Sequence, residues 1–167
     1  MGHGAWGMDG DRVTLEGCAE ADAAETLVRH QMADDYLRHG LTWDSERFHQ
    51  RFPERCWRWA VCDRGRVGLL AWEHSADVAV LRELHVVPDE RGKGIGTHLL
   101  ALWEDMARLS GAQCLRLRVL SGSRAVSWYQ RQGYQQVRGC PTPHGQVLGL
   151  EKAVVHDRAA HSGAAKG

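Results

Sequence analysis

The 167-residue sequence lacks several features that would place it in a specialised class of protein. It has no net charge with histidine neutral, so no global field favours nucleic acid or a membrane surface. Its five cysteines are odd in number and form no Cys-x-x-Cys pair, which argues against a disulfide framework or a zinc site. It also has no long apolar run and no charged-then-apolar N-terminal segment. We therefore expect a reduced, cytoplasmic protein with no metal, no membrane segment and no nucleic-acid partner.

The composition is typical of one compact domain. Hydrophobic residues make up 43% and charged residues 25% of the chain, which are ordinary globular values, and this length can bury a core. Residues 1–10 contain four glycines and are expected to be a flexible leader. Residues 156–167 are small and polar and are expected to be a disordered tail. We predict a single domain over residues 11–155.

Hydrophobic periodicity and turn residues predict strands that alternate with helices. Strands are expected at residues 11–17, 57–62, 66–73, 77–87, 114–120, 134–138 and 146–152. Helices are expected at residues 19–39, from residue 42 or 44 to 51, at 95–109 and at 123–132. A loop at residues 141–143 should link the last two strands. This order predicts an α/β domain with a mixed sheet.

The most informative segment is Arg91–Thr97, Arg-Gly-Lys-Gly-Ile-Gly-Thr, here called the glycine loop. It follows an apolar strand and leads directly into an amphipathic helix. Glycine lets the backbone turn closely around an anion, and the helix N-terminus offers free N–H groups and a positive dipole end. The spacing excludes a P-loop. It also excludes a dinucleotide-binding fingerprint, since Thr97 stands where the third glycine of that pattern would fall. The loop therefore predicts a diphosphate site, with a ligand-free helix-capping turn as the alternative.

A second segment, residues 121–134, carries four residues at a defined spacing: Ala125, Tyr129, Gly133 and Tyr134. They match the pattern Asn-x-x-Ala-x-x-x-Tyr-x-x-x-Gly-Phe. Together with Arg-x-x-Gly-x-Gly in the glycine loop, this pattern resembles the two signatures of the GCN5-related N-acetyltransferase (GNAT) superfamily. The resemblance covers about residues 67–152. The chain departs from the pattern at Gly122, where the family often has asparagine.

The resemblance implies a GNAT-like α/β fold, with a mixed, mostly antiparallel sheet whose central strands splay apart between flanking helices. It implies transfer of an acetyl group from acetyl-coenzyme A (acetyl-CoA) to a primary amine, by direct attack in a ternary complex. It also implies that the pantetheine arm pairs with the strand before the glycine loop. The cofactor-binding residues would then be Leu84, His85, Val86, Arg91, Gly92, Lys93, Gly94, Ile95, Gly96, Thr97 and Ser123. Family members are often dimers through their final strands, so a homodimer is one alternative.

Tyr129, Glu83 and His85 are the candidate catalytic residues. The resemblance implies that Tyr129 protonates the leaving thiolate, with a core tyrosine as the alternative. Period two places Glu83 and His85 on one strand face together with Leu81 and Val87, so either could accept the proton of the ammonium. A hydrogen-bonded sheet histidine, a Glu83 that only binds a cationic acceptor, and a base-free water chain remain alternatives.

The acceptor pocket is expected to involve Met32, Tyr36 and Trp43 of the N-terminal helices, together with Glu83. The alternative is that the first three only pack the helix on the sheet. The predicted function is acetylation of a small-molecule primary amine. A protein-lysine acetyltransferase and a non-catalytic acyl-CoA-binding regulatory module are the competing hypotheses.

Overall fold

The computed structural model of the chain describes residues 12–156, so the predicted leader and all but the first residue of the predicted tail lie outside the described residues. Seven strands form one sheet in the order β1-β2-β3-β4-β5-β7-β6. They are β1 (Thr14–Gly17), β2 (Cys56–Cys62), β3 (Gly65–Ser75), β4 (Val78–Val86), β5 (Cys114–Leu120), β6 (Gln135–Thr142) and β7 (Gly145–Ala153). Only β4 and β5 pair in parallel. The predicted mixed, mostly antiparallel sheet is thus confirmed.

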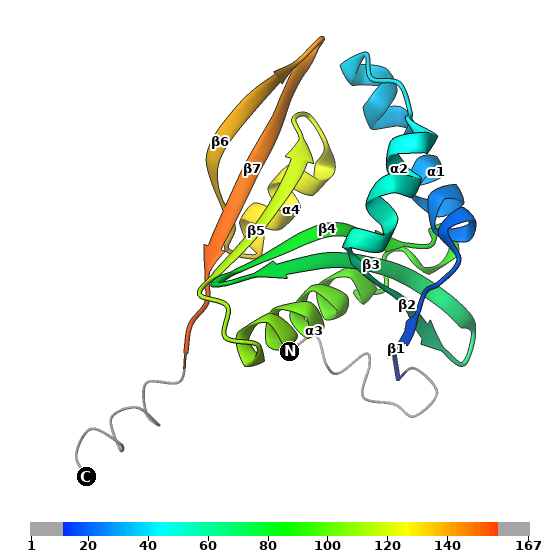
Figure 1. The fold of residues 1–167 in the computed structure, drawn as a ribbon, viewed down its shortest axis with the longest axis vertical. Coiled ribbons are helices and arrows are strands. Elements are labelled where there is room, and N and C mark those ends of the chain that lie inside the picture. The colour runs from blue at the N-terminus through cyan, green and yellow to red at the C-terminus, as the bar shows by residue number, and fades with distance from the viewer. Residues whose placement is uncertain (1–11, 157–167) are drawn as a thin grey trace, which may run out of the picture.

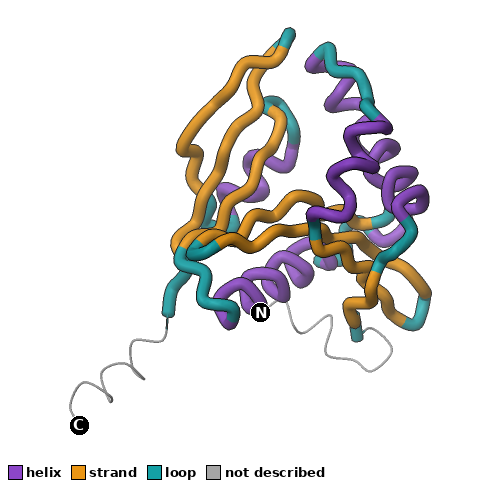
Figure 2. The backbone as a smooth tube through the Cα atoms, viewed as in Figure 1, coloured by secondary structure: helices purple, strands orange, loops and turns teal. Residues whose placement is uncertain are grey.

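Helices cover both faces of this sheet (Figures 1 and 2). They are α1 (Ala21–His39), α2 (Ser45–Arg51), α3 (Ile95–Leu109) and α4 (Arg124–Arg131), with short 3-10 turns η2 (Phe52–Glu54) and η3 (Pro88–Glu90). Two apolar clusters result, one with α1 and α2 packed on β2 and β3, the other with α3 and α4. Trp57 and Trp59 are buried in the first cluster. No helix within residues 12–156 has the length and apolar character needed to cross a membrane.

The helix ends follow from capping residues that are visible in the sequence. Gly40 ends α1 in the left-handed conformation, at φ 67°, where its N–H bonds to the last-turn carbonyls. Asp44, the second of the two predicted caps, starts α2 by accepting a hydrogen bond from the Arg47 backbone N–H. These ends fix the short connection that brings α2 back beside α1.

The central strands splay apart, as the family resemblance implied. Parallel pairing joins Val78–Leu81 of β4 to Cys114–Leu117 of β5 and then stops. Beyond this point β4 continues beside β3, whereas β5 continues beside β7 (Figure 1). The facing edges of β4 and β5 are therefore left unpaired in the second half of each strand.

A bulge in β4 changes which residues share a face. Trp72 pairs with Leu81 and Ala71 pairs with Glu83, so Arg82 has no residue opposite it in β3. The extra residue reverses the alternation along the strand. Leu81 is only 4% exposed and packs in the core with α3, on the opposite face from Glu83. The prediction that Leu81 shares a face with Glu83 is therefore wrong.

The β6–β7 hairpin is longer than the sequence predicted. Pro141 belongs to β6, where it pairs with Gln146, and the connection is shortened to residues 143–144. The predicted loop at residues 141–143 is thus corrected. Proline is tolerated here because β6 lies at the edge of the sheet, where a missing N–H breaks no ladder.

Candidate active site

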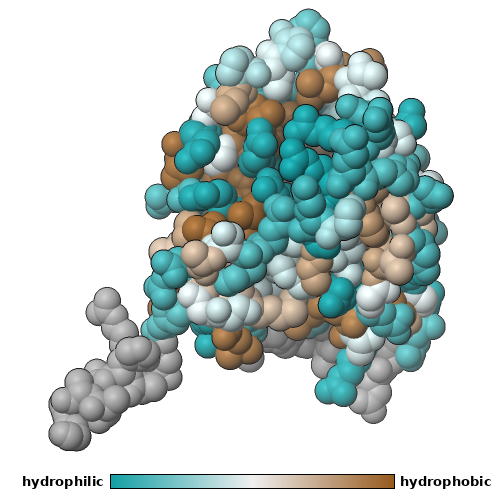
Figure 3. All heavy atoms as spheres, viewed as in Figure 1, coloured by the Kyte–Doolittle hydropathy of each residue, from teal (hydrophilic) through white to brown (hydrophobic). Residues whose placement is uncertain are grey.

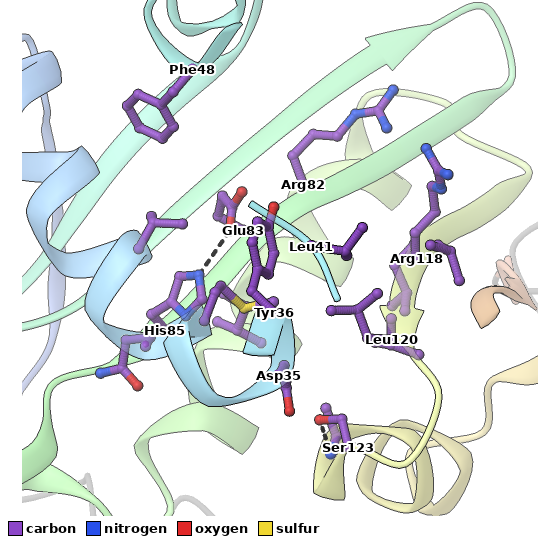
Figure 4. Close-up of a pocket in the computed structure, with 18 of the residues that line it drawn as sticks. Asp35, Tyr36, Leu41, Phe48, Arg82, Glu83, His85, Arg118, Leu120 and Ser123 are labelled. Atoms are coloured by element: carbon purple, nitrogen blue, oxygen red, sulfur yellow. Dashed lines mark hydrogen bonds and ion pairs between the residues drawn. The ribbon is translucent and has the colours of Figure 1, made fainter. Parts of the chain in front are cut away.

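A cavity of about 660 Å³ opens where β4 and β5 separate (Figure 4). Helices α1 and α2 and the connection between them form one wall, β4 and β5 the floor, and the start of α4 the opposite wall. Eight of the predicted site residues line this one cavity: Met32, Tyr36, Trp43, Glu83, Leu84, His85, Ser123 and Tyr129. Segments that are remote in sequence therefore meet around a single space.

Glu83 and His85 form a hydrogen-bonded pair on the cavity side of β4. The Nε2 atom of His85 lies 2.7 Å from Oε1 of Glu83, and the two side chains are 10% and 17% exposed. Tyr36 projects from α1 beside Glu83 (Figure 4). Burial, followed by the charge of Glu83, raises the pKa of Tyr36. The arrangement can accept a proton at Glu83 or His85 inside a partly desolvated site.

Tyr129 reaches the same cavity from α4. Its residue is 8% exposed, and its ring packs edge-on against Trp128 and Tyr134. Burial, with a smaller contribution from the Glu83 charge, raises the pKa of Tyr129 well above the ordinary tyrosine range. Tyr129 lines the cavity. The hydroxyl therefore keeps its proton at neutral pH and is free to donate it.

The glycine loop lies beside this cavity and does not line it. Gly92 and Gly94 adopt positive φ angles of 78° and 82°, which favour glycine. Gly94 caps α3, and no side chain caps the first turn of that helix. Free N–H groups at a helix start suit an anion, so the loop fits the predicted diphosphate. Ile95 is buried and anchors the helix start, while Gly96 contacts Val86 and Trp128.

Both cations of the glycine loop already have protein partners. Arg91 donates a hydrogen bond to the Gln31 side-chain oxygen, and Lys93 Nζ lies 3.2 Å from Glu90. Glu90 also bonds to Arg64, and this contact lowers its pKa. Gln31 in turn donates to the Val86 carbonyl at 3.0 Å and lines the cavity. Gln31 thus links the glycine loop to the unpaired edge of β4.

The backbone N–H and C=O groups of β4 point alternately toward β3 and toward the gap between β4 and β5. A Cβ placed on Gly68 of β3 would lie 2.8 Å from the His85 carbonyl oxygen, so this carbonyl faces β3. Alternation then directs the backbone groups of Leu84 and Val86 toward the gap. Leu84 and Val86 therefore present unpaired backbone groups to the gap, whereas His85 presents its side chain to the cavity.

The structure at the start of α4 explains why Gly122 stands where the family pattern often has asparagine. This residue has φ 78°, and a Cβ there would lie 2.9 Å from a guanidinium nitrogen of Arg38. Arg38 also donates to the Gly122 carbonyl at 3.2 Å. Ser123 then caps α4 by accepting from the Ala125 N–H at 3.1 Å. Glycine is thus favoured by the left-handed backbone conformation at this position.

The sequence analysis missed five arginines that line the cavity. They are Arg47, Arg51, Arg55, Arg82 and Arg118, here called the arginine cluster. Hydrophilic side chains gather over α2 and the centre of the face seen in Figure 3. Helix and strand periodicity in the sequence does not indicate that these arginines point into one cavity. The bulge at Arg82 also interrupts the alternation of side chains along β4. Only the tertiary fold brings these cations together.

The chain belongs to the acetyltransferase (GNAT) domain family, whose model matches residues 53–136. This range contains β2 to α4, and therefore the glycine loop, Glu83, His85 and Tyr129.

Particular relatives agree with this membership. The chain is 40% identical over 63 residues to an uncharacterized N-acetyltransferase, YhfO, of Bacillus subtilis, and 39% identical over 64 residues to an aminoalkylphosphonate N-acetyltransferase of Salmonella typhimurium. These matches cover 37% and 38% of this chain and 42% of each relative. An acetyltransferase of Bacillus subtilis, solved in complex with CoA, superposes with a TM-score of 0.65 at 13% identity, over 86% of this chain and 99% of the other. The structural match shows a shared fold.

Proposed function

We propose that this protein transfers the acetyl group of acetyl-CoA to the primary amine of a small molecule, in a ternary complex. The observation that carries the proposal is the convergence of Tyr129 with the Glu83–His85 pair in one cavity beside the glycine loop. A merely acyl-CoA-binding module would have no need of a proton acceptor and a proton donor that line one cavity. Family membership supports the same reaction class.

In this proposal the glycine loop and Arg91 hold the diphosphate, while Leu84 and Val86 hold the pantetheine arm by their backbone groups. In the same proposal Lys93 and Thr97 of the glycine loop, and Ser123 at the start of α4, assist in holding the cofactor. The bound acetyl-CoA supplies the thioester. Positioning of donor and acceptor in one cavity supplies much of the rate.

The residues that line the cavity then accept and donate the protons of the reaction. Glu83, with His85, accepts a proton from the acceptor ammonium, and the freed nitrogen bonds to the acetyl carbon as the carbon–sulfur bond breaks. Tyr129 donates its proton to the departing sulfur. The nitrogen loses a second proton as the amide forms, which balances the proton that Tyr129 gives up. The products are the acetylated amine, free coenzyme A and one net proton.

The shape of the cavity favours a small acceptor. Met32, Tyr36 and Trp43 form an apolar and aromatic wall, with the Tyr36 and Trp43 rings 5.7 Å apart. All three also pack on neighbouring residues, as the alternative interpretation of these positions expects. The Salmonella relative is named for a small amine, which points the same way. A protein lysine would need an open groove.

The first test is titration of the folded protein with acetyl-CoA by calorimetry, beside an Arg91→Ala, Gly94→Ala double variant. Saturable binding by the wild type that is lost in the variant supports the glycine-loop site. Arg108→Ala, a surface change on α3, is the matched control and should bind as the wild type does. Release of coenzyme A with a panel of amines then tests transfer. Absence of binding by the folded wild type would overturn the proposal.

A further inference from the structure

The cavity carries an excess of positive charge next to the proposed reaction centre. Five arginines line it, against three carboxylates among the described residues. Each of these acids is already engaged. Asp35 pairs with Arg38, Asp44 caps α2, and Glu83 bonds to His85. Arg51 pairs with Glu54, which does not line the cavity. The acids of the cavity lining thus only partly neutralise its arginines.

Arg55 and Arg82 lie closest to the Glu83–His85 pair. Arg55 Nη1 is 3.8 Å from Glu83 Oε2, and its Nε atom is buried with no hydrogen-bond partner in the described part of the chain. Burial lowers the pKa of the Arg55 guanidinium, and the Glu83 carboxylate partly offsets this effect. Arg82 is the extra residue of the β4 bulge and lines the cavity, and its guanidinium donates a hydrogen bond to Glu73 of β3.

The remaining arginines extend the cluster across the cavity. Arg47 of α2 and Arg118 of β5 have no ion-pair partner within residues 12–156. Arg118 and Arg82 project on the same side of the cavity, away from Ser123 and the start of α4 (Figure 4). The arginine cluster therefore lies on the acceptor side, and the glycine loop is not part of it.

We propose that the acceptor is an amine that also carries an acidic group, a carboxylate or a phosphonate, which the arginine cluster binds. This inference rests on the proposed function and specifies its acceptor. The planar guanidinium donates paired hydrogen bonds to such groups, and its fixed charge strengthens them. The acid then holds the molecule so that its amine faces Glu83. The same positive field disfavours polyamines and other polycationic acceptors.

The test is calorimetric binding to the full-length protein saturated with coenzyme A, which fills the donor site and removes competition there. The probes are 2-aminoethylphosphonate and β-alanine. Their neutral partners, named for the neutral group that replaces the acid, are ethanolamine and β-alaninamide, which keep the amine. We expect saturable binding of at least one acid and at least tenfold weaker binding of its neutral partner. Spermidine should bind no better than ethanolamine.

Variants identify the residues responsible. Arg82→Gln and Arg118→Gln should each weaken binding of the acid by roughly tenfold to a hundredfold, the usual worth of a hydrogen bond to a charged group. They should leave acetyl-CoA affinity unchanged. Arg108→Gln, on the far side of the sheet, is the control and should bind the acid as the wild type does.

Two results separate this inference from the proposed function. If coenzyme A binds but the acids bind no better than their neutral partners, or do not bind, the acidic acceptor is overturned and transfer to other amines can still be measured. If coenzyme A itself fails to bind the folded protein, the proposed function falls. Equal acid binding by the arginine variants would also overturn the assignment to this cluster.

Discussion

His85 Nε2 and Glu83 Oε1 lie 2.7 Å apart on the cavity face of β4, one residue beyond the bulge at Arg82. The pair places the His85 imidazole against a carboxylate that orients it. Because both side chains are largely shielded from water, a proton taken from the acceptor stays within the site.

Glu83→Gln should lower kcat with little effect on the affinity for acetyl-CoA. The amide keeps the shape and can still bond to His85, but it can no longer accept the proton, and positioned proton transfer is worth roughly 10²–10⁴ in rate. The measurement is the rate of coenzyme A release at saturating donor. A rate that recovers when the pH is raised, so that the acceptor amine is already neutral, would support the role as base. An unchanged rate at neutral pH would assign the proton to His85 or to water.

Tyr129→Phe should lower kcat by roughly 10²–10⁴ and leave acetyl-CoA binding unchanged, since only the donated proton is lost. Calorimetry and coenzyme A release measure the two effects separately. Tyr36→Phe, on the opposite wall, is a matched removal of a buried hydroxyl and should retain far more activity. An unaltered rate in the Tyr129 variant would favour a passive core tyrosine.

Gln31→Ala should strengthen acetyl-CoA binding by roughly threefold to tenfold, because one or two hydrogen bonds worth about 0.5–1.5 kcal/mol no longer have to be broken. Gln31 occupies both the Arg91 guanidinium and the Val86 carbonyl, two of the groups proposed to hold the cofactor. Gln50→Ala on the surface of α2 serves as the control. Weaker binding would instead mean that Gln31 contacts the cofactor itself.

Gly122→Ala should destabilise the fold by about 1–2 kcal/mol, the cost of a left-handed conformation for a residue with a Cβ. The φ of 78° is the structural reason, and the Arg38 guanidinium, 2.9 Å from the position of the added Cβ, would also have to move. Gly17→Ala meets nothing within 4 Å and should be tolerated. Denaturant unfolding of both variants checks the difference, and equal stabilities would contradict the backbone explanation.

Stability should fall as the pH rises above 10, in part through Tyr134. Burial, then the nearby Glu104 charge, raises the pKa of this residue in the folded state above its ordinary value of 10.0. Between the two values the folded protein keeps a proton that the unfolded chain has lost, so the stabilisation is complete below pH 10 and declines above it.

Denaturant unfolding at pH 8 and pH 11 measures this effect. Tyr134→Phe removes the titrating hydroxyl, so the decline between the two values should be smaller than in the wild type. At pH 8 the variant should be less stable by about 1.5–3 kcal/mol, because the hydrogen bond to Glu104 is lost. An identical decline in both proteins would exclude Tyr134 as a contributor.

The sequence by itself determined the features that depend on local chain chemistry. The glycine loop, the caps at Gly40 and Asp44, and the apolar stripe of α3 are encoded within a few residues, since turn geometry and helix capping act over short distances. The spacing around Tyr129 was recognisable for the same reason. These features were enough to predict the fold class and the family.

Only the tertiary structure decided how remote segments meet. The bulge at Arg82 depends on pairing between β3 and β4, and it reversed the face on which Leu81 lies. The contacts of Gln31 with Arg91 and Val86 join residues more than fifty positions apart. The arginine cluster converges for the same reason, because long-range packing places α2, β4 and β5 around one cavity. No local pattern encodes that convergence, since an exposed arginine looks the same in the sequence wherever its side chain is directed.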